Sequence, residues 1–221
     1  MFKNILFDLD GTLTDSFEGI ANSALYALHE MGVTKYNKSN LNFFIGPPLY
    51  DSFGMIFDGD MQKVERAITL YREYFADRGW KENRVYDGVS QMLQQLKDCG
   101  KTLLVATSKP ELFARRIVEY FDLNKYFTFV AGASMDDSRT KKAKVIEYAI
   151  ANTGIDKADT IMIGDRNHDI LGAKQCGLKS MGVLYGYGDR QEHTDAGADY
   201  IAETPQDVVR IIRNSESGIR N

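Results

Sequence analysis

At 221 residues, 43% of them hydrophobic and 26% charged, the chain has the size and composition of a globular protein with one large or two small domains. A formal net charge of −4 and a pI near 5.5 give no broad cationic surface, so we expect no nucleic-acid polymer as a partner. The two distant cysteines, the lack of a signal-peptide pattern and the lack of a membrane-spanning apolar run predict a cytoplasmic protein without disulfides that does not contact a membrane.

The first predicted element is a buried strand over residues 2–7, which ends in Asp8-Leu9-Asp10-Gly11-Thr12. Gly11 permits a tight turn, so the carboxylate of Asp10 can fold back over that of Asp8. Two anions this close are unfavourable in a core unless a cation lies between them or one keeps its proton. Mg²⁺, which prefers oxygen ligands, is the expected cation. The alternative is a strand end with solvated acids, which matching acids further along the chain would disfavour.

Residues 15–84 show helical periodicity, with apolar residues recurring over 15–32 and 60–78 and no β-rich run between them. Pro47 and Pro48 block a continuous helix in the middle of this region. We therefore predict an all-helical subdomain over 15–84, inserted into a domain formed by 1–14 and 85–221.

From residue 86 onward, predicted strands alternate with helices of about 10 residues. Such alternation indicates an α/β fold with a doubly wound parallel sheet, in which ligands bind beyond the carboxyl ends of the strands. The tail from Ser215 is expected to be frayed. The strands are expected at 102–107, 127–131, 160–164, 180–184 and 199–202, and the last helix begins at Thr204-Pro205.

Polar and charged side chains follow several of these strands, and a parallel sheet brings such strand ends to one edge. Acids, hydroxyls and lysines therefore converge on the edge where Asp8 and Asp10 lie. The residues concerned are Thr107, Ser108 and Lys109, then Arg139, Lys141 and Lys142, and finally Asp165 and Asp169.

Asp8-x-Asp10-Gly11-Thr12, Thr107, a following lysine and Gly164-Asp165-x-x-x-Asp169 resemble the four motifs of the haloacid dehalogenase superfamily. The inserted helices resemble its helical cap in position and length. Within the superfamily, Thr107-Ser108-Lys109-Pro110 and the segment 164–170 resemble the phosphoglycolate-phosphatase-like branch.

The resemblance implies that Asp8 is a nucleophile that forms an aspartyl-phosphate and that Asp10 is the general acid and base. It implies a Mg²⁺ ion held by Asp8, the backbone carbonyl of Asp10 and Asp165, with Asp169 orienting water or a lysine. Thr107 would donate a hydrogen bond to the phosphoryl group, Lys142 would neutralise charge on nucleophile and phosphate, and Ser108 would bind phosphate oxygens through its backbone.

Two points stay open at this level, and one further residue is assigned no role. The active-site lysine is expected to be Lys142, but Lys141 is one position away. Gly46 and Pro47 lie in a rigid loop of the helical region that could contact the leaving group of the substrate. His193 is assigned to a polar loop without a role.

The resulting hypothesis is a Mg²⁺-dependent phosphatase for a small phosphorylated metabolite similar to phosphoglycolate. A 5′-nucleotidase or an inorganic pyrophosphatase with the same site is the alternative. A sugar-phosphate mutase and a non-catalytic binding module are less favoured, the latter because none of the motifs is broken. The sequence leaves the oligomeric state open between monomer and homodimer.

Overall fold

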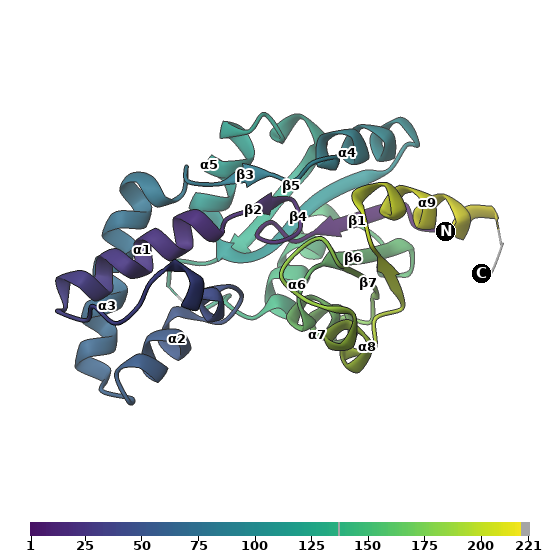
Figure 1. Cartoon of the computed structure of the whole chain (residues 1–221). Coiled ribbons are helices and arrows are strands. Elements are labelled where there is room, and N and C mark those ends of the chain that lie inside the picture. The colour runs from purple at the N-terminus through teal and green to yellow at the C-terminus, as the bar shows by residue number, and fades with distance from the viewer. Residues whose placement is uncertain (137, 218–221) are drawn as a thin grey trace. The chain divides into compact units, whose positions relative to one another are not determined.

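The computed structural model describes residues 1–136 and 138–217, and the chain folds as two compact units (Figure 1). One unit consists of Met1–Thr14 together with the chain from Val85 onward, and the other is Asp15–Arg84. The first is built around a six-stranded sheet, and the second is helical. Two short strands, β2 (Thr14–Asp15) and β3 (Arg84–Val85), form a separate two-stranded sheet.

The six-stranded sheet is parallel, with the strand order β5-β4-β1-β6-β7-β8. From β1 the chain continues to β4 and then to β5 at one edge. It then crosses back to β6 on the other side of β1 and continues outward through β7 to β8. The strand order therefore reverses at β1, and such a switch point is where α/β sheets bind ligands. The strands are β1 (Asn4–Phe7), β4 (Thr102–Pro110), β5 (Phe127–Ala133), β6 (Thr160–Gly164), β7 (Lys179–Val183) and β8 (Tyr200–Ala202).

Helices cover both faces of this sheet, with α4, α5 and α9 on one face and α6, α7 and α8 on the other (Figure 1). Several of them end at a glycine with positive φ, such as Gly154 after α6, because glycine adopts this conformation without steric cost. The helices are α4 (Val89–Asp98), α5 (Glu111–Tyr120), α6 (Lys142–Thr153), α7 (Asn167–Gln175), α8 (Arg190–Ala196) and α9 (Pro205–Ser217).

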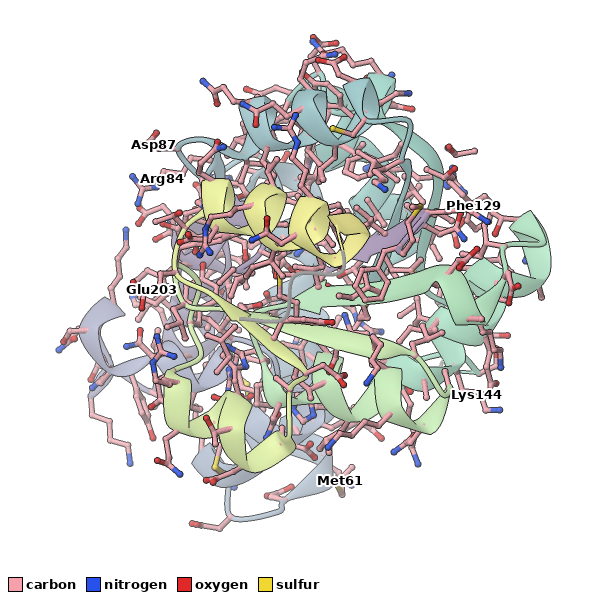
Figure 2. All side chains as sticks on the ribbon, turned by 90° about the vertical axis from the view of Figure 1, so that its right-hand side faces the viewer. Met61, Arg84, Asp87, Phe129, Lys144 and Glu203 are labelled. Carbon is pink, nitrogen blue, oxygen red and sulfur yellow. The ribbon has the colours of Figure 1, made fainter. Side chains whose placement is uncertain are left out.

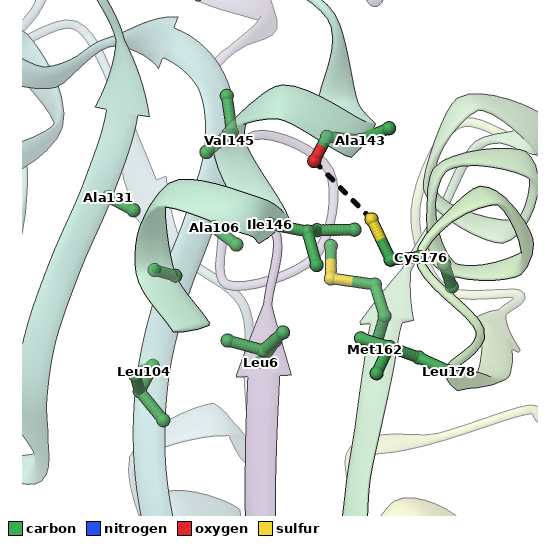
Figure 3. Close-up of a cluster of buried hydrophobic side chains, with 12 residues drawn as sticks. Leu6, Leu104, Ala106, Ala131, Ala143, Val145, Ile146, Met162, Cys176 and Leu178 are labelled. Atoms are coloured by element: carbon green, nitrogen blue, oxygen red, sulfur yellow. Dashed lines mark hydrogen bonds between the residues drawn. The ribbon is translucent and has the colours of Figure 1, made fainter. Parts of the chain in front are cut away.

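The core between the sheet and helices α6 and α7 consists of aliphatic side chains (Figure 3). Leu6, Leu104 and Met162, from three adjacent strands, are fully buried against Ile146 of α6. Charged side chains such as Lys144 and Glu203 instead point outward (Figure 2). This packing fixes α6 and α7 on the sheet, and both helices carry residues of the candidate site.

The helical unit contains α1 (Phe17–Glu30), α2 (Leu49–Ile56) and α3 (Met61–Tyr74), and a π-helical turn follows α3 over Phe75–Gly79. Its core contains a cluster of aromatic rings: Phe53 is fully buried, and its ring centroid lies 4.8 Å from that of Phe44 and 6.3 Å from that of Tyr71. This unit is therefore held together mainly by apolar burial.

The predicted fold class, an α/β doubly wound parallel sheet with an inserted helical region, is confirmed. The assignment of His193 to a polar loop is wrong, because this residue lies on α8 and is fully buried. The helix α9 includes Ser215 and continues to Ser217, and the remainder of the tail that was expected to fray lies outside the described residues. No helix within 1–136 and 138–217 has the length and apolar character needed to cross a membrane.

Candidate active site

Three carboxylates meet at the switch point of the sheet. Asp8 directly follows β1, Asp165 directly follows β6, and Asp169 lies in the first turn of α7. One oxygen from each can be chosen so that all three lie within 4.8 Å of one another. The register explains this convergence: Phe7 pairs with Ile163, and the backbone N–H of Asp8 donates to the Ile163 carbonyl at 2.9 Å.

Lys142 is the cation that contacts this cluster. Its Nζ lies 2.9 Å from Asp8 Oδ1 and 2.8 Å from Asp169 Oδ1, and it donates to the Ala106 carbonyl at 3.0 Å. Its side chain is 4% exposed, whereas Lys141 is exposed to solvent. The geometry therefore gives the expected role to Lys142, which begins α6, and not to its neighbour.

Burial dominates the electrostatics of the cluster. Burial, followed by the charges of Asp169 and Asp8, raises the pKa of Asp165 well above its usual range. Burial also raises the pKa of Asp169 to about 6, although Lys142 opposes this rise. For Lys142, burial acts to lower the pKa, but the carboxylates of Asp169 and Asp8 outweigh it and the pKa is raised. The lysine is therefore charged, but its single positive charge does not neutralise the three carboxylates.

Asp165 is held in place by its neighbours. Its Oδ1 accepts from the Thr12 hydroxyl at 3.2 Å, and its Oδ2 accepts from the Tyr187 backbone N–H at 3.0 Å. Gly11 has φ +80°, and a Cβ built there would lie 2.1 Å from Asp165 Oδ2. The glycine of the first motif therefore allows both the tight turn and the close approach of the last acid.

Asp10 lies apart from this trio and has a lysine of its own. Its Oδ2 accepts from Lys109 Nζ at 2.5 Å, and the side chains are 20% and 6% exposed. The other oxygen, Asp10 Oδ1, is buried and has no hydrogen-bond partner among the described residues. The site thus contains two separate lysine–carboxylate arrangements.

The end of β4 supplies the hydroxyl groups. Thr107 is buried, and its Oγ1 accepts from the backbone N–H of Lys109 at 3.2 Å. Its hydroxyl proton can still be donated to a ligand. Ser108, between the two, is exposed to solvent.

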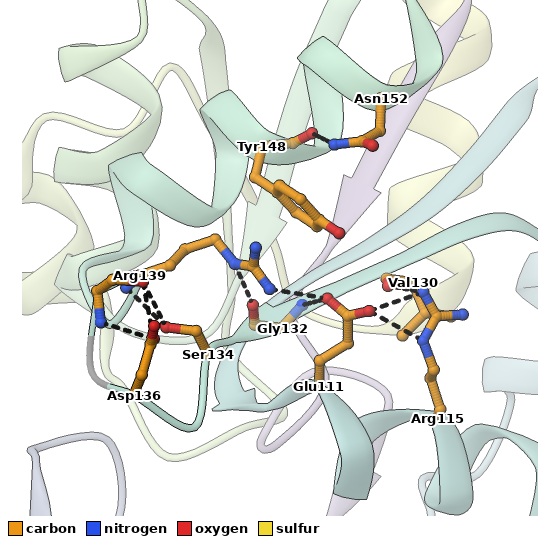
Figure 4. Close-up of polar contacts among 10 residues, drawn as sticks. Glu111, Arg115, Val130, Gly132, Ser134, Asp136, Arg139, Tyr148 and Asn152 are labelled. Atoms are coloured by element: carbon orange, nitrogen blue, oxygen red, sulfur yellow. Dashed lines mark hydrogen bonds and ion pairs between the residues drawn. The ribbon is translucent and has the colours of Figure 1, made fainter.

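A polar network fixes the segment that leads into α6 (Figure 4). Arg139 lies 3.0 Å from Glu111 Oε2, donates to the Gly132 carbonyl at 2.8 Å, and stacks on the ring of Tyr148 with 3.5 Å to the centroid. Glu111 begins α5 and Tyr148 belongs to α6, so the arginine joins both helices to β5. Arg139 therefore stabilises the approach to Lys142 and does not belong to the acidic cluster.

The residues present fit a divalent cation with oxygen ligands. Four carboxylates (Asp8, Asp10, Asp165 and Asp169) and two lysines leave a formal charge of −2 in a largely buried site. The raised pKa values of Asp165 and Asp169 have a related cause, namely burial in a site with too little positive charge. Without a bound cation, protonation of these acids is the remaining way to reduce the negative charge. Mg²⁺ matches this donor set of carboxylate and carbonyl oxygens.

Sequence reasoning assigned no role to Lys109 or Thr12, although both lie within the motifs. The signal for Lys109 was its spacing of two from Thr107 on a strand, which places both side chains on one side. Gly46 and Pro47 lie in the helical unit, before α2. Their contact with a substrate stays a prediction.

Comparison with known proteins places this geometry in a family. Residues 5–183 match the family model described as haloacid dehalogenase-like hydrolase. The chain belongs to the haloacid dehalogenase-like hydrolases. The predicted resemblance is thereby confirmed, and the enzyme is a phosphatase of this family.

Individual relatives carry different names. The chain is 42% identical to a 5′-nucleotidase of Pseudomonas aeruginosa over 191 residues, covering 86% of each chain. It is 38% identical to the tyrosine-protein kinase PtkA of Mycobacterium tuberculosis, covering 93% of this chain and 67% of that one. A phosphoglycolate phosphatase of Vibrio parahaemolyticus is 27% identical, with 95% and 96% covered.

Among solved structures, a predicted phosphatase from Clostridium acetobutylicum is similar with a TM-score of 0.91 and 43% identity, covering 97% of this chain and 99% of that one. A putative phosphatase from Clostridium difficile has a TM-score of 0.88 and 45% identity, with 95% and 98% covered. Both of these proteins share the fold of this chain.

Proposed function

We propose that this haloacid dehalogenase-like enzyme is a Mg²⁺-dependent phosphomonoesterase that hydrolyses a small phosphorylated metabolite through an aspartyl-phosphate on Asp8. The observation that carries the proposal is the contact of Lys142 with both Asp8 and Asp169, next to buried Asp165. A nucleophilic carboxylate beside a buried cation suits attack on a phosphate dianion, because the cation reduces the repulsion between them.

In the first step, a carboxylate oxygen of Asp8 attacks phosphorus and forms the acyl-phosphate bond. The bond from phosphorus to the leaving-group oxygen breaks, and Asp10 gives its proton to that oxygen, so an alcohol leaves. Lys142 and the Thr107 hydroxyl stabilise the charge on the phosphoryl oxygens. The backbone of Ser108 offers a further donor to them.

In the second step, Asp10 accepts a proton from water as the water oxygen attacks phosphorus. The bond between phosphorus and Asp8 breaks, which restores the carboxylate and releases inorganic phosphate. Asp10 thereby regains the proton that it gave in the first step, and the net reaction consumes one water molecule.

Asp8, Asp165 and the backbone carbonyl of Asp10 would hold the Mg²⁺ ion, and Asp169 would keep Lys142 directed at Asp8. When bound, Mg²⁺ supplies positive charge that offsets the repulsion between the Asp8 carboxylate and the phosphate. This assignment is supported by the clustered oxygens of Asp8, Asp165 and Asp169 and by the formal charge of −2.

The leaving group has two candidates. A small carboxylated alcohol, as in phosphoglycolate, follows from the motifs of the branch, with Gly46 and Pro47 contacting it. A nucleoside is the second candidate, because the relative named 5′-nucleotidase is 42% identical and the one named phosphoglycolate phosphatase is 27% identical.

The test is phosphate release from a panel that contains phosphoglycolate, nucleoside 5′-monophosphates and pyrophosphate, with Mg²⁺ and with a chelator. We expect hydrolysis only with Mg²⁺. Asp8→Asn, which is nearly isosteric, should lower kcat by about 10⁴-fold or more. Asp98→Asn, at an exposed position on α4, is the matched control and should leave kcat unchanged. Full hydrolysis by Asp8→Asn would remove Asp8 from the role of nucleophile.

A further inference from the structure

The two oxygens of the Asp10 carboxylate have different surroundings. Oδ2 accepts from Lys109 Nζ at 2.5 Å, while Oδ1 is buried and has no hydrogen-bond partner within the described parts of the chain. A buried carboxylate oxygen without a partner costs free energy and is uncommon in folded proteins. Such an atom is a candidate for a contact that forms only when the substrate or its attacking water is bound.

Lys109 is held rigidly at the end of β4. Its side chain is 6% exposed, and its backbone N–H donates to Thr107 Oγ1 at 3.2 Å. Pro110 follows, which restricts the backbone of Lys109 to extended conformations. The pairing with β5 shifts its register between Ala106 and Pro110, so this part of the strand departs from regular geometry. The ammonium group is therefore mounted on a fixed backbone beside Asp10.

The site contains two buried lysines, Lys109 and Lys142. Lys142 contacts Asp8 and Asp169, whereas Lys109 contacts Asp10. The neutralisation of the nucleophile is thus already provided by Lys142. Lys109, beside Asp10, is therefore a candidate for a role in another step of the reaction.

We propose that Lys109 is a positioning residue: it holds the Asp10 carboxylate by Oδ2, so that Oδ1 makes both proton transfers, to the leaving group and from the attacking water. The inference rests on the proposed function, in which Asp10 is the general acid and base. When Oδ2 of the protonated Asp10 accepts a hydrogen bond from Lys109, the proton of the acid lies on Oδ1. Oδ2 then fixes the carboxyl group in place, and Oδ1 exchanges the proton. An error of about 1 Å in such a placement costs about 10²-fold in rate.

The test uses Lys109→Met in the whole 221-residue chain with Mg²⁺, in pre-steady-state measurements on two substrates. An alkyl phosphate needs a proton on its leaving oxygen, whereas p-nitrophenyl phosphate releases a stable phenolate. We expect the first turnover of the alkyl phosphate to slow by about 10²-fold. Release of p-nitrophenolate should keep its wild-type rate in the first turnover. Later turnovers should be slower, which gives a burst, because hydrolysis of the aspartyl-phosphate needs Asp10 to activate water. The substrate concentration that gives half of the maximal first-turnover rate should stay unchanged, because Lys109 is not expected to bind the substrate.

Two variants separate this role from a merely structural one. Lys109→Arg keeps the charge and should recover part of the alkyl phosphate rate, and it also serves if Lys109→Met fails to fold. Lys101→Met removes a buried lysine directly before the first residue of β4, where Nζ donates to the Phe2 carbonyl at 2.8 Å. This control should lower stability without any dependence on the leaving group.

The inference is overturned if Lys109→Met slows the first turnover of both substrates equally, since this would indicate direct binding of the phosphate. It is also overturned if Lys109→Met slows an Asp10→Asn enzyme by the same factor as the wild type, since a residue that acts through Asp10 has no effect without it. Failure of the proposed function is a different result: wild-type enzyme would show no hydrolysis, or Asp8→Asn would remain active.

Discussion

The α/β unit and the helical unit bury different kinds of side chain. The α/β unit buries Lys109, Lys142, Asp165 and Asp169 at the end of its sheet. In the helical unit, every residue of which is described, the buried polar side chains are serines, and the apolar core includes a cluster of aromatic rings. Burying a charged side chain costs free energy. A cluster of buried charged side chains therefore indicates a site for binding or chemistry.

Because of this contrast, we expect substitutions in the two units to change different properties. Changes in the aromatic core of the helical unit should appear first in the free energy of unfolding. Changes in the buried charges of the α/β unit should appear first in rate and in the response to pH and metal. Three measurements test this division.

The largest expected effect is on stability, from Phe53→Ala in the helical unit. Phe53 is fully buried between Phe44 and Tyr71, so truncation removes apolar burial and leaves a cavity. We expect a loss of about 3–5 kcal/mol in chemical denaturation. Met55→Ala in the same helix is the control, because Met55 is 63% exposed and its removal should change little. Equal stability of the two variants would contradict an aromatic core.

The next effect is on rate, from Lys142→Met. Removing the cation that contacts Asp8 should lower kcat by about 10²–10³-fold, or about 2.7–4 kcal/mol, as for other groups that stabilise developing charge. Lys141→Met, one residue away and exposed, should retain the wild-type kcat. The measurement is steady-state hydrolysis with saturating Mg²⁺, with circular dichroism as the check on folding. A larger loss in Lys141→Met would reverse the assignment.

The smallest effect is on the pH dependence of stability without metal. The pKa of Asp169 is raised to about 6 in the folded state, so the folded protein binds more protons than the unfolded one between about pH 4 and 6. The stabilisation from this group is present below its unfolded pKa and is lost as pH rises through 6. The unfolding free energy of wild type minus that of Asp169→Asn should therefore fall with rising pH, by at most about 1.4 kcal/mol per pH unit.

This comparison is made in a chelator by urea denaturation. His168 titrates in the same range with the opposite sign, because burial lowers its pKa, but it is present in both proteins and cancels in the difference. Asp195→Asn, at an exposed position on α8, should show no such slope. A difference that stays flat or rises with pH would contradict a raised pKa for Asp169.

Much of the fold followed from local patterns in the sequence. The alternation of apolar strands with helices predicted the parallel sheet, and the periodicity of residues 15–84 predicted the helical region. His193 shows the limit of this reasoning. A histidine among polar neighbours was assigned to a loop, yet it is buried, with Nε2 3.1 Å from the Val183 carbonyl. Local polarity does not reveal a contact made across the fold.

The sequence by itself determined which chemical groups gather at the sheet edge, because parallel strands bring their carboxyl ends together and the motifs place acids, hydroxyls and lysines there. Only the tertiary structure decided which lysine serves which acid. Lys141 is the extended residue before α6 and Lys142 is the first residue of the helix, and packing turns Lys142 inward while Lys141 stays in solvent. The pairing of Lys109 with Asp10 joins residues 99 positions apart, and such a contact exists only once the sheet has formed.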